Sequence, residues 1–106
     1  MDEYIIQTDS YDFEDRIDHP AVLVYFYDHR DIRCRGFEAI IGEVAERYQE
    51  DVIVLSVDTE QSPELAYRYG IDSVPFVIFF RDGEPAADIE GANLPGVYCD
   101  MIDSYI

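Results

Sequence analysis

The sequence predicts an α/β fold of three layers, in which helices cover both faces of a central mixed sheet. Apolar runs of strand length alternate with segments of helical spacing along most of the chain. The runs at 21–27, 52–57 and 77–80 are almost continuously apolar, which is typical of strands buried on both faces. A glycine-containing turn at 81–84 then returns the chain antiparallel. With 106 residues, 48% of them hydrophobic, we expect a single domain over 1–106.

The first part of the chain predicts a strand, a short helix and a second strand. A Tyr-Ile-Ile core suits a strand at 3–8, and Asp9 and Ser10 offer capping oxygens for a helix at 11–18. Pro20 interrupts that helix, because the residue before a proline is pushed out of helical geometry. The run at 21–27 is the second strand. A turn follows it, and the spacing becomes helical from Asp31.

One helical face is predicted after this turn, and a third strand and short helix follow. The apolar residues of that face are Phe37, Ile40, Ile41, Val44, Ala45 and Tyr48. The run at 52–57 is a buried-type strand. Ser62 and Pro63 then suit the start of a helix at 65–69, with proline at its first position and Gly70 at its end.

A hairpin and a final helix are predicted at the C-terminal end. The hairpin joins 77–80 to 85–90, and Asn93 is a candidate N-cap for the last helix. The inward face of that helix is predicted to hold Val97, Tyr98, Met101, Ile102 and Tyr105. Cys99 falls outside this stripe, which predicts a partly exposed thiol.

The charge balance excludes whole classes of partner. Twenty-four acidic residues face seven basic ones, for a net charge of −17, so nucleic acid and anionic membranes would be repelled. A solvated acidic shell explains the charge, and a basic protein partner or a high-salt habitat are the alternatives. No apolar run is long enough to span a membrane and no leader pattern is present. Together with two cysteines sixty-five residues apart, this predicts a cytoplasmic protein.

Four landmarks, in order and at matching spacing, make the chain resemble the thioredoxin family over essentially its whole length. They are the strand Val22-Leu23-Val24-Tyr25-Phe26-Tyr27, the segment Tyr69-Gly70-Ile71-Asp72-Ser73-Val74-Pro75-Phe76, the turn Phe80-Arg81-Asp82-Gly83-Glu84, and Gly91-Ala92. The resemblance implies a thioredoxin-like α/β/α sandwich and a cis Val74–Pro75 bond beside the active site. The alternative is that Pro75 only starts a strand.

The same resemblance exposes a departure at the active site. The family motif has two cysteines separated by two residues, and these positions read Asp31-Ile32-Arg33-Cys34 here. Only the second cysteine remains, and a carboxylate cannot undergo thiol exchange. Tyr25 stands at the position of the family's proton-handling aspartate, Val54 at that of its paired lysine, and Arg30 at that of a tryptophan. Asp31 is then expected to cap the start of the motif helix.

Two functions follow from this comparison, and the resemblance places both in one groove. We expect a non-catalytic polypeptide-binding or chaperone-like module, and the predicted binding residues are Arg30, Asp31, Ile32, Arg33, Val74 and Pro75. The alternative is a residual monothiol oxidoreductase of redox homeostasis with Cys34 as its catalytic residue. A buried structural role for Cys34 is also open. Burial and Asp31 would raise the pKa of its thiol, whereas a helix N-terminus and the neighbouring arginines would lower it, and the sequence does not decide between these opposed effects. A third hypothesis is acidic docking to a basic protein.

Metal-ligating residue types occur together in the motif turn. Asp28, His29, Asp31 and Cys34 offer oxygen, nitrogen and sulfur within seven residues, but their spacing matches no zinc motif. His29 is interpreted as a solvated turn residue. We therefore expect no metal and no cofactor.

Overall fold

The computed structural model describes residues 3–106. Within that range the elements follow in the order β1 (Ile5–Gln7), α1 (Phe13–Arg16), β2 (Ala21–Tyr27), the 3₁₀ turn η1 (Ile32–Cys34), α2 (Phe37–Arg47), β3 (Ile53–Asp58), α3 (Pro63–Arg68), β4 (Phe76–Arg81), β5 (Glu84–Glu90) and α4 (Pro95–Asp103). The predicted alternation of strands and helices is confirmed. The separate turn η1 was not predicted.

The strands form one mixed sheet in the order β1-β3-β2-β4-β5. β1, β3 and β2 are parallel, and β4 and β5 are antiparallel to their neighbours. The hairpin turn between β4 and β5 carries positive φ at Asp82 (52°) and Gly83 (83°), as a tight two-residue turn between twisted strands requires. β2 lies at the centre of the sheet between β3 and β4, so the turn that follows it starts from a strand paired on both sides.

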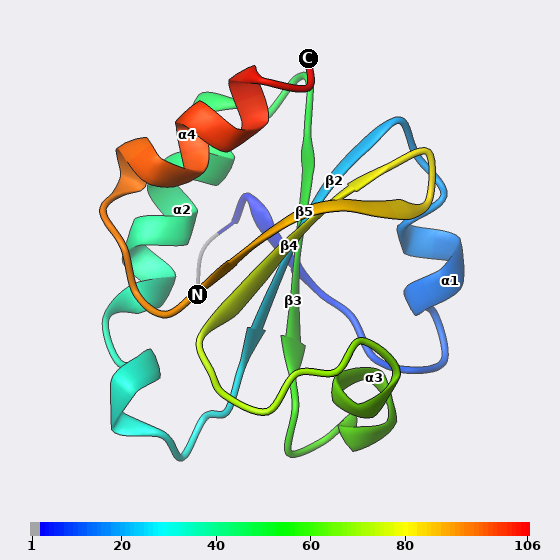
Figure 1. Cartoon of the computed structure of the whole chain (residues 1–106), viewed down its shortest axis with the longest axis vertical. Helices are drawn as coiled ribbons and strands as arrows, with labels where there is room; N and C mark the ends of the chain where they lie inside the picture. The colour runs from blue at the N-terminus through cyan, green and yellow to red at the C-terminus, as the bar shows by residue number, and fades with distance from the viewer. Residues whose placement is uncertain (1–2) are drawn as a thin grey trace.

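Helices cover both faces of this sheet. Figure 1 shows α2 and α4 on one side and α1 and α3 on the other. Along β2, Leu23 and Tyr25 belong to the core under α2 and α4, whereas Val24 and Phe26 belong to the core under α1 and α3. Burial on both faces explains the continuous apolar run of β2. Within residues 3–106, no helix is long and apolar enough to cross a membrane.

The helix of the motif region does not start where the sequence suggested. Asp31 is the N-cap of η1, and η1 contains only three residues. Gly36 then adopts φ 76°, and α2 begins at Phe37. Because a left-handed residue interrupts the helical hydrogen-bond ladder, the motif turn and α2 are separate elements. The prediction that Asp31 starts the long helix is therefore wrong, although its capping role is confirmed for η1.

The last helix also departs from its prediction. Its N-cap residue is Leu94, while the Asn93 side chain donates to the carbonyl oxygen of Gly91 at 3.2 Å instead. Cys99 is buried rather than partly exposed, because α4 packs on α2 with the Tyr48 hydroxyl donating to the Cys99 carbonyl oxygen at 3.3 Å. The buried residues of α4 are Tyr98, Cys99 and Ile102. Of the predicted inward residues, Tyr98 and Ile102 are buried and Met101 is half-buried, whereas Val97 and Tyr105 are exposed.

Candidate functional site

Three segments meet at the carboxyl ends of β2 and β3, where crevices in open α/β sheets form. They are the motif turn at 28–34, the segment 59–66 that continues into α3, and the loop 71–75 that leads into β4. Between them lies a cavity of about 280 Å³. Its lining residues are Asp28, Arg33, Thr59, Pro63, Ala66, Ile71, Asp72, Ser73 and Val74.

Two acid–arginine pairs fix the shape of the motif turn. Asp28 accepts the backbone N–H of Arg30 at 2.9 Å and forms an ion pair with its guanidinium at 2.8 Å. Asp31 likewise accepts the backbone N–H of Arg33 at 2.8 Å and forms an ion pair with the Arg33 guanidinium at 2.6 Å. The side-chain hydrogen bonds from Arg30 lower the pKa of Asp28 to about 2. Both carboxyls are therefore ionised at neutral pH, and each holds the backbone two residues further on.

Cys34 is a buried thiol, 8% exposed. Its backbone N–H donates to the carbonyl oxygen of Asp31 at 3.0 Å. Burial raises the pKa of the Cys34 thiol, and the Asp31 carboxylate acts in the same direction. The helix N-terminus that was expected to lower this pKa is reduced to the three-residue turn η1. The thiol is consequently protonated at neutral pH.

Core packing occupies the positions at which the resemblance implies a proton relay. Tyr25 is 1% exposed and stacks on Tyr27, with 5.2 Å between ring centroids, while Phe37 approaches it edge-on at 5.4 Å. Burial raises the pKa of Tyr25 far above its ordinary value. Val54 is buried as well. Neither side chain can accept a proton from a thiol at neutral pH.

The loop before β4 carries a cis Val74–Pro75 peptide bond, the geometry that the resemblance implied. β4 begins after it, at Phe76, and the Pro75 carbonyl oxygen accepts the Gly91 N–H at 2.9 Å. Across residues 3–106, the N–H and C=O of Val74 appear in no backbone hydrogen bond outside the helices and strands, and the β4 pairing starts only at Phe76. Val74 therefore lines the cavity with main-chain groups that the β4 pairing does not use.

The structure brings only some of the predicted binding residues together. Arg33 and Val74 line the same cavity, although they lie forty-one positions apart. Ile32, which is 73% exposed, and Pro75, which is buried, are not among the lining residues. Arg30 and Asp31 form ion pairs within the turn, Arg30 with Asp28 and Asp31 with Arg33. The lining residues from α3 and the loop 71–73 were not predicted. Their one signal in the sequence is that they lie between a buried-type strand and Pro75.

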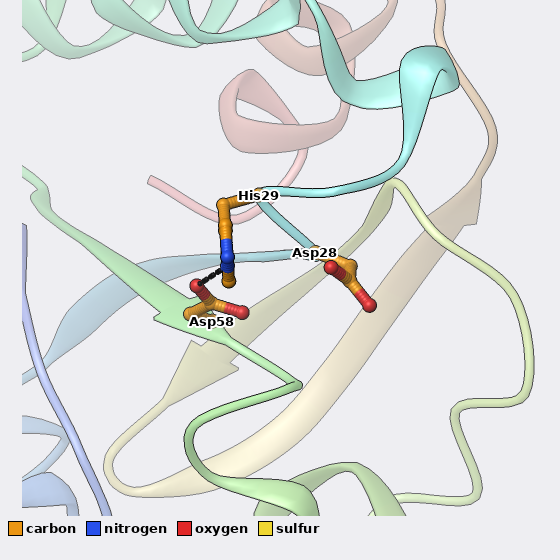
Figure 2. Close-up of side chains that lie close together, drawn as sticks. All are labelled: Asp28, His29 and Asp58. Atoms are coloured by element: carbon orange, nitrogen blue, oxygen red, sulfur yellow. Dashed lines mark hydrogen bonds and ion pairs between the residues drawn. The ribbon is translucent and has the colours of Figure 1, made fainter.

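A histidine–aspartate pair borders the site, and its second member was not predicted. His29 Nδ1 lies 2.7 Å from Asp58 Oδ2. Figure 2 shows the His29 ring over the Asp58 carboxylate, with the Asp28 carboxylate beside them. The His29 side chain is 51% exposed and that of Asp58 only 3%. The interpretation of His29 as a solvated turn residue is therefore incomplete, because it also has a buried partner.

Comparison with known proteins agrees with this architecture. The thioredoxin family model matches residues 4–103. Thioredoxin 1 of Synechococcus elongatus is 31% identical over 85 residues, which are 80% of this chain and 79% of the relative. A chloroplastic M-type thioredoxin of Triticum aestivum is 36% identical over 85 residues, 80% of this chain, and the match spans about half (49%) of that relative's length.

Among solved structures, a mutant thioredoxin from Halobacterium salinarum superimposes with a TM-score of 0.87 at 27% identity, covering 95% of this chain and 89% of the other. The family match over nearly the whole chain, the similarity to curated thioredoxins and the shared fold agree with one another. The chain belongs to the thioredoxin family.

Proposed function

We propose that this protein is a non-catalytic polypeptide-binding module of the thioredoxin family, which holds an extended segment between the motif turn and the Val74–Pro75 loop. The observation that carries the proposal is the cavity that Arg33 and Val74 share, with Val74 main-chain groups that the β4 pairing does not use. An extended chain pairs with such groups by adding main-chain hydrogen bonds, and neighbouring pockets then select its side chains. Binding of this kind needs no thiol.

The chemistry of the motif supports binding over dithiol turnover. Asp31 replaces the exposed nucleophile, and Cys34 is buried with a raised pKa. A thiol that stays protonated attacks disulfides slowly, because the thiolate is the nucleophile. Tyr25 supplies no base, since burial holds its hydroxyl in the protonated form. At neutral pH the site therefore holds neither an exposed nucleophilic thiolate at position 31 nor a base at Tyr25, which dithiol turnover would need.

The lining of the cavity indicates which segments would bind. Ala66, Ile71 and Val74 offer apolar surface, while Asp28 and Asp72 carry negative charge. The chain as a whole carries −17. Basic segments are attracted to such a surface by long-range electrostatics. The preferred ligand is thus an extended segment that places an apolar side chain next to lysine or arginine.

Insulin B chain with both cysteines blocked by iodoacetamide is the test ligand, because it cannot form a mixed disulfide. We expect its titration to shift backbone NMR signals of 28–34 and 71–75. Ala66→Trp, which fills the cavity, should abolish these shifts. Tyr67→Ala is the matched control on the same helix, since Tyr67 is 89% exposed and lines no part of the cavity. Equal binding by Ala66→Trp, or shifts confined to other surfaces, would refute the proposal.

A monothiol oxidoreductase is the second candidate, favoured by Cys34 at the motif position and by relatives that are named thioredoxins. In this reaction the Cys34 thiolate attacks the glutathione sulfur of a glutathionylated protein thiol, so that the S–S bond breaks, the protein thiolate leaves and glutathione remains on Cys34 as a mixed disulfide. Reduced glutathione then attacks the glutathione sulfur of that mixed disulfide, which frees the Cys34 thiol and releases oxidised glutathione. Both cysteines are free in the structure, which suits a reducing compartment, and we place either function in the cytoplasm.

Mass spectrometry after incubation with oxidised glutathione separates the two candidates. A rapid adduct that peptide mapping assigns to Cys34, and that Cys34→Ser loses, would support the monothiol reaction. An unmodified native protein that reacts only after unfolding would leave polypeptide binding as the function of the site. Cys99 gives the internal reference, because it is also buried, at 6% exposure, and lies on α4 outside the motif.

A further inference from the structure

We propose that Asp28, His29 and Asp58 form a binding site for a divalent transition-metal ion of the zinc class, beside the polypeptide groove. One ligand atom from each residue lies within 4.8 Å of the other two. The site combines a nitrogen with two carboxylate oxygens, a donor set that zinc accepts. The expectation of no metal rested on the spacing of the ligand types within 28–34. Asp58 lies 29 positions beyond His29, and only the fold brings it to the turn.

The distances are close to those of a bound ion. Zinc holds nitrogen and oxygen ligands at about 2.0–2.2 Å, which places tetrahedral ligand atoms about 3.3–3.6 Å apart. The His29–Asp58 pair is closer than this, at 2.7 Å, and the widest separation in the set is at most 4.8 Å. An ion that replaces the shared proton between His29 and Asp58 would push this pair apart and draw Asp28 inward.

The backbone already holds the buried ligand in place. Asp58 pairs with Tyr27 in the β2–β3 ladder, and the Thr59 N–H donates to the Tyr27 carbonyl oxygen at 2.7 Å. The Glu60 N–H donates to Asp58 Oδ1 at 3.0 Å, which leaves Oδ2 directed at His29. A ligand whose second oxygen is hydrogen-bonded keeps its orientation toward a metal. Asp58 is therefore the fixed member, and His29 on the exposed turn is the movable one.

Arg30 fits the role of a supporting residue around this site. It donates to both oxygens of Asp28, at 3.0 and 2.8 Å. Each carboxylate oxygen has two lone pairs, so one oxygen can accept from Arg30 and bind a metal at the same time. The Arg30 guanidinium balances the charge of Asp28, so one negative charge, that of Asp58, is left facing the imidazole and would attract a divalent cation. The half-exposed His29 leaves the remaining coordination position open to water.

A metal at this position would sit at the rim of the groove, since Asp28 also lines the cavity. This inference does not depend on the proposed function, because its ligands include neither Cys34 nor Val74. The two proposals can therefore fail separately. A bound metal ion would still alter the charge at one end of the groove.

The test is titration of the purified, chelator-treated protein with Zn²⁺ alone, followed by calorimetry in the presence of excess Mg²⁺. We expect one saturable Zn²⁺ equivalent that Mg²⁺ does not displace, because Mg²⁺ prefers an all-oxygen octahedral shell. His29→Gln and Asp58→Asn should each weaken binding at least about tenfold. His19→Gln is the matched control and should leave it unchanged, since the chain has only two histidines.

Imidazole ¹⁵N NMR gives a readout that is independent of affinity. Zn²⁺ should shift the Nδ1 signal of His29 and leave His19 unaffected, and urea unfolding should show that each variant is folded. Binding that His29→Gln retains, that His19→Gln reduces equally, or that Mg²⁺ abolishes would show only diffuse association with the acidic surface and would overturn the proposal. A shift at Nε2 with Nδ1 unchanged would overturn the proposed insertion between His29 and Asp58.

Discussion

Restoring the missing thiol by Asp31→Cys tests how much of the thioredoxin chemistry depends on position 31 alone. The Cys34 N–H donates to the Asp31 carbonyl oxygen at 3.0 Å, which makes 31–34 a hydrogen-bonded turn. The end Cα atoms of such a turn lie within about 7 Å, and disulfides span up to about 6.8 Å between Cα atoms. We therefore expect the variant to form an intramolecular disulfide on mild oxidation.

The size of the effect follows from the length of the closed loop. In the chain-entropy model, a disulfide that closes a four-residue loop stabilises the folded state by about 2 kcal/mol, or roughly 20- to 30-fold in the ratio of folded to unfolded chain. Urea unfolding of the oxidised and reduced variant measures this difference directly. Asp31→Ser is the matched control, because it removes the carboxylate and keeps a capping hydroxyl without adding a thiol.

Disulfide formation should not restore efficient catalysis. Tyr25 and Val54 stay buried at the positions where the resemblance implies a proton relay, and a positioned acid–base group typically contributes about 10²- to 10⁴-fold to a rate. Insulin reduction by the variant should therefore stay at least about 100-fold below that of a thioredoxin with both motif cysteines. Three thiols that remain titratable after oxidation would refute the turn geometry. Turnover equal to such a thioredoxin would refute the argument about the relay.

Four further predictions concern stability. Leu65→Ala should lower the free energy of unfolding by about 2–5 kcal/mol in urea titrations, because Leu65 is fully buried; a loss below about 1 kcal/mol would show that α3 does not pack as described. Tyr98→Phe should lower the free energy of unfolding by about 0.5–1.5 kcal/mol in the same assay, because it removes the 3.1 Å hydrogen bond from the Tyr98 hydroxyl to the Gly91 carbonyl oxygen while Asn93 still donates to that oxygen; an unchanged free energy would contradict this hydrogen bond. The hydrogen bond from Thr8 lowers the pKa of Asp12 from 3.8 to about 2, so the stability advantage over Asp12→Asn should be complete above pH 4 and disappear as pH falls through 2; an advantage that stays constant over that range would contradict the assignment. Added NaCl should raise the melting temperature, because salt screens the self-repulsion of a net charge of −17, and a melting temperature independent of salt would contradict a repulsive acidic shell.

Local patterns predicted the elements where one physical cause dominated. The run of β2 could be recognised from sequence because a strand buried on both faces excludes polar residues, and its bounds at 21–27 agree with the structure. Pro63 marked the start of α3, because its ring fixes φ near the helical value. Gly70 marked the end, because glycine adopts a left-handed conformation with little strain. The last helix was predicted less well. Which of its residues are buried depends on how α4 packs against α2 and the sheet, which no local period encodes.

The sequence by itself determined the fold class, the family resemblance and the presence of a single cysteine in the motif turn, because these depend on residue types and their order along the chain. Tertiary structure decided the environment of those residues. It buried Cys34 and so raised its pKa, it placed Val74 in the lining of a cavity that Arg33 also lines, and it brought Asp58 to His29. Burial and contacts between distant segments arise only when strands pair and helices cover them, so no local pattern could have supplied them.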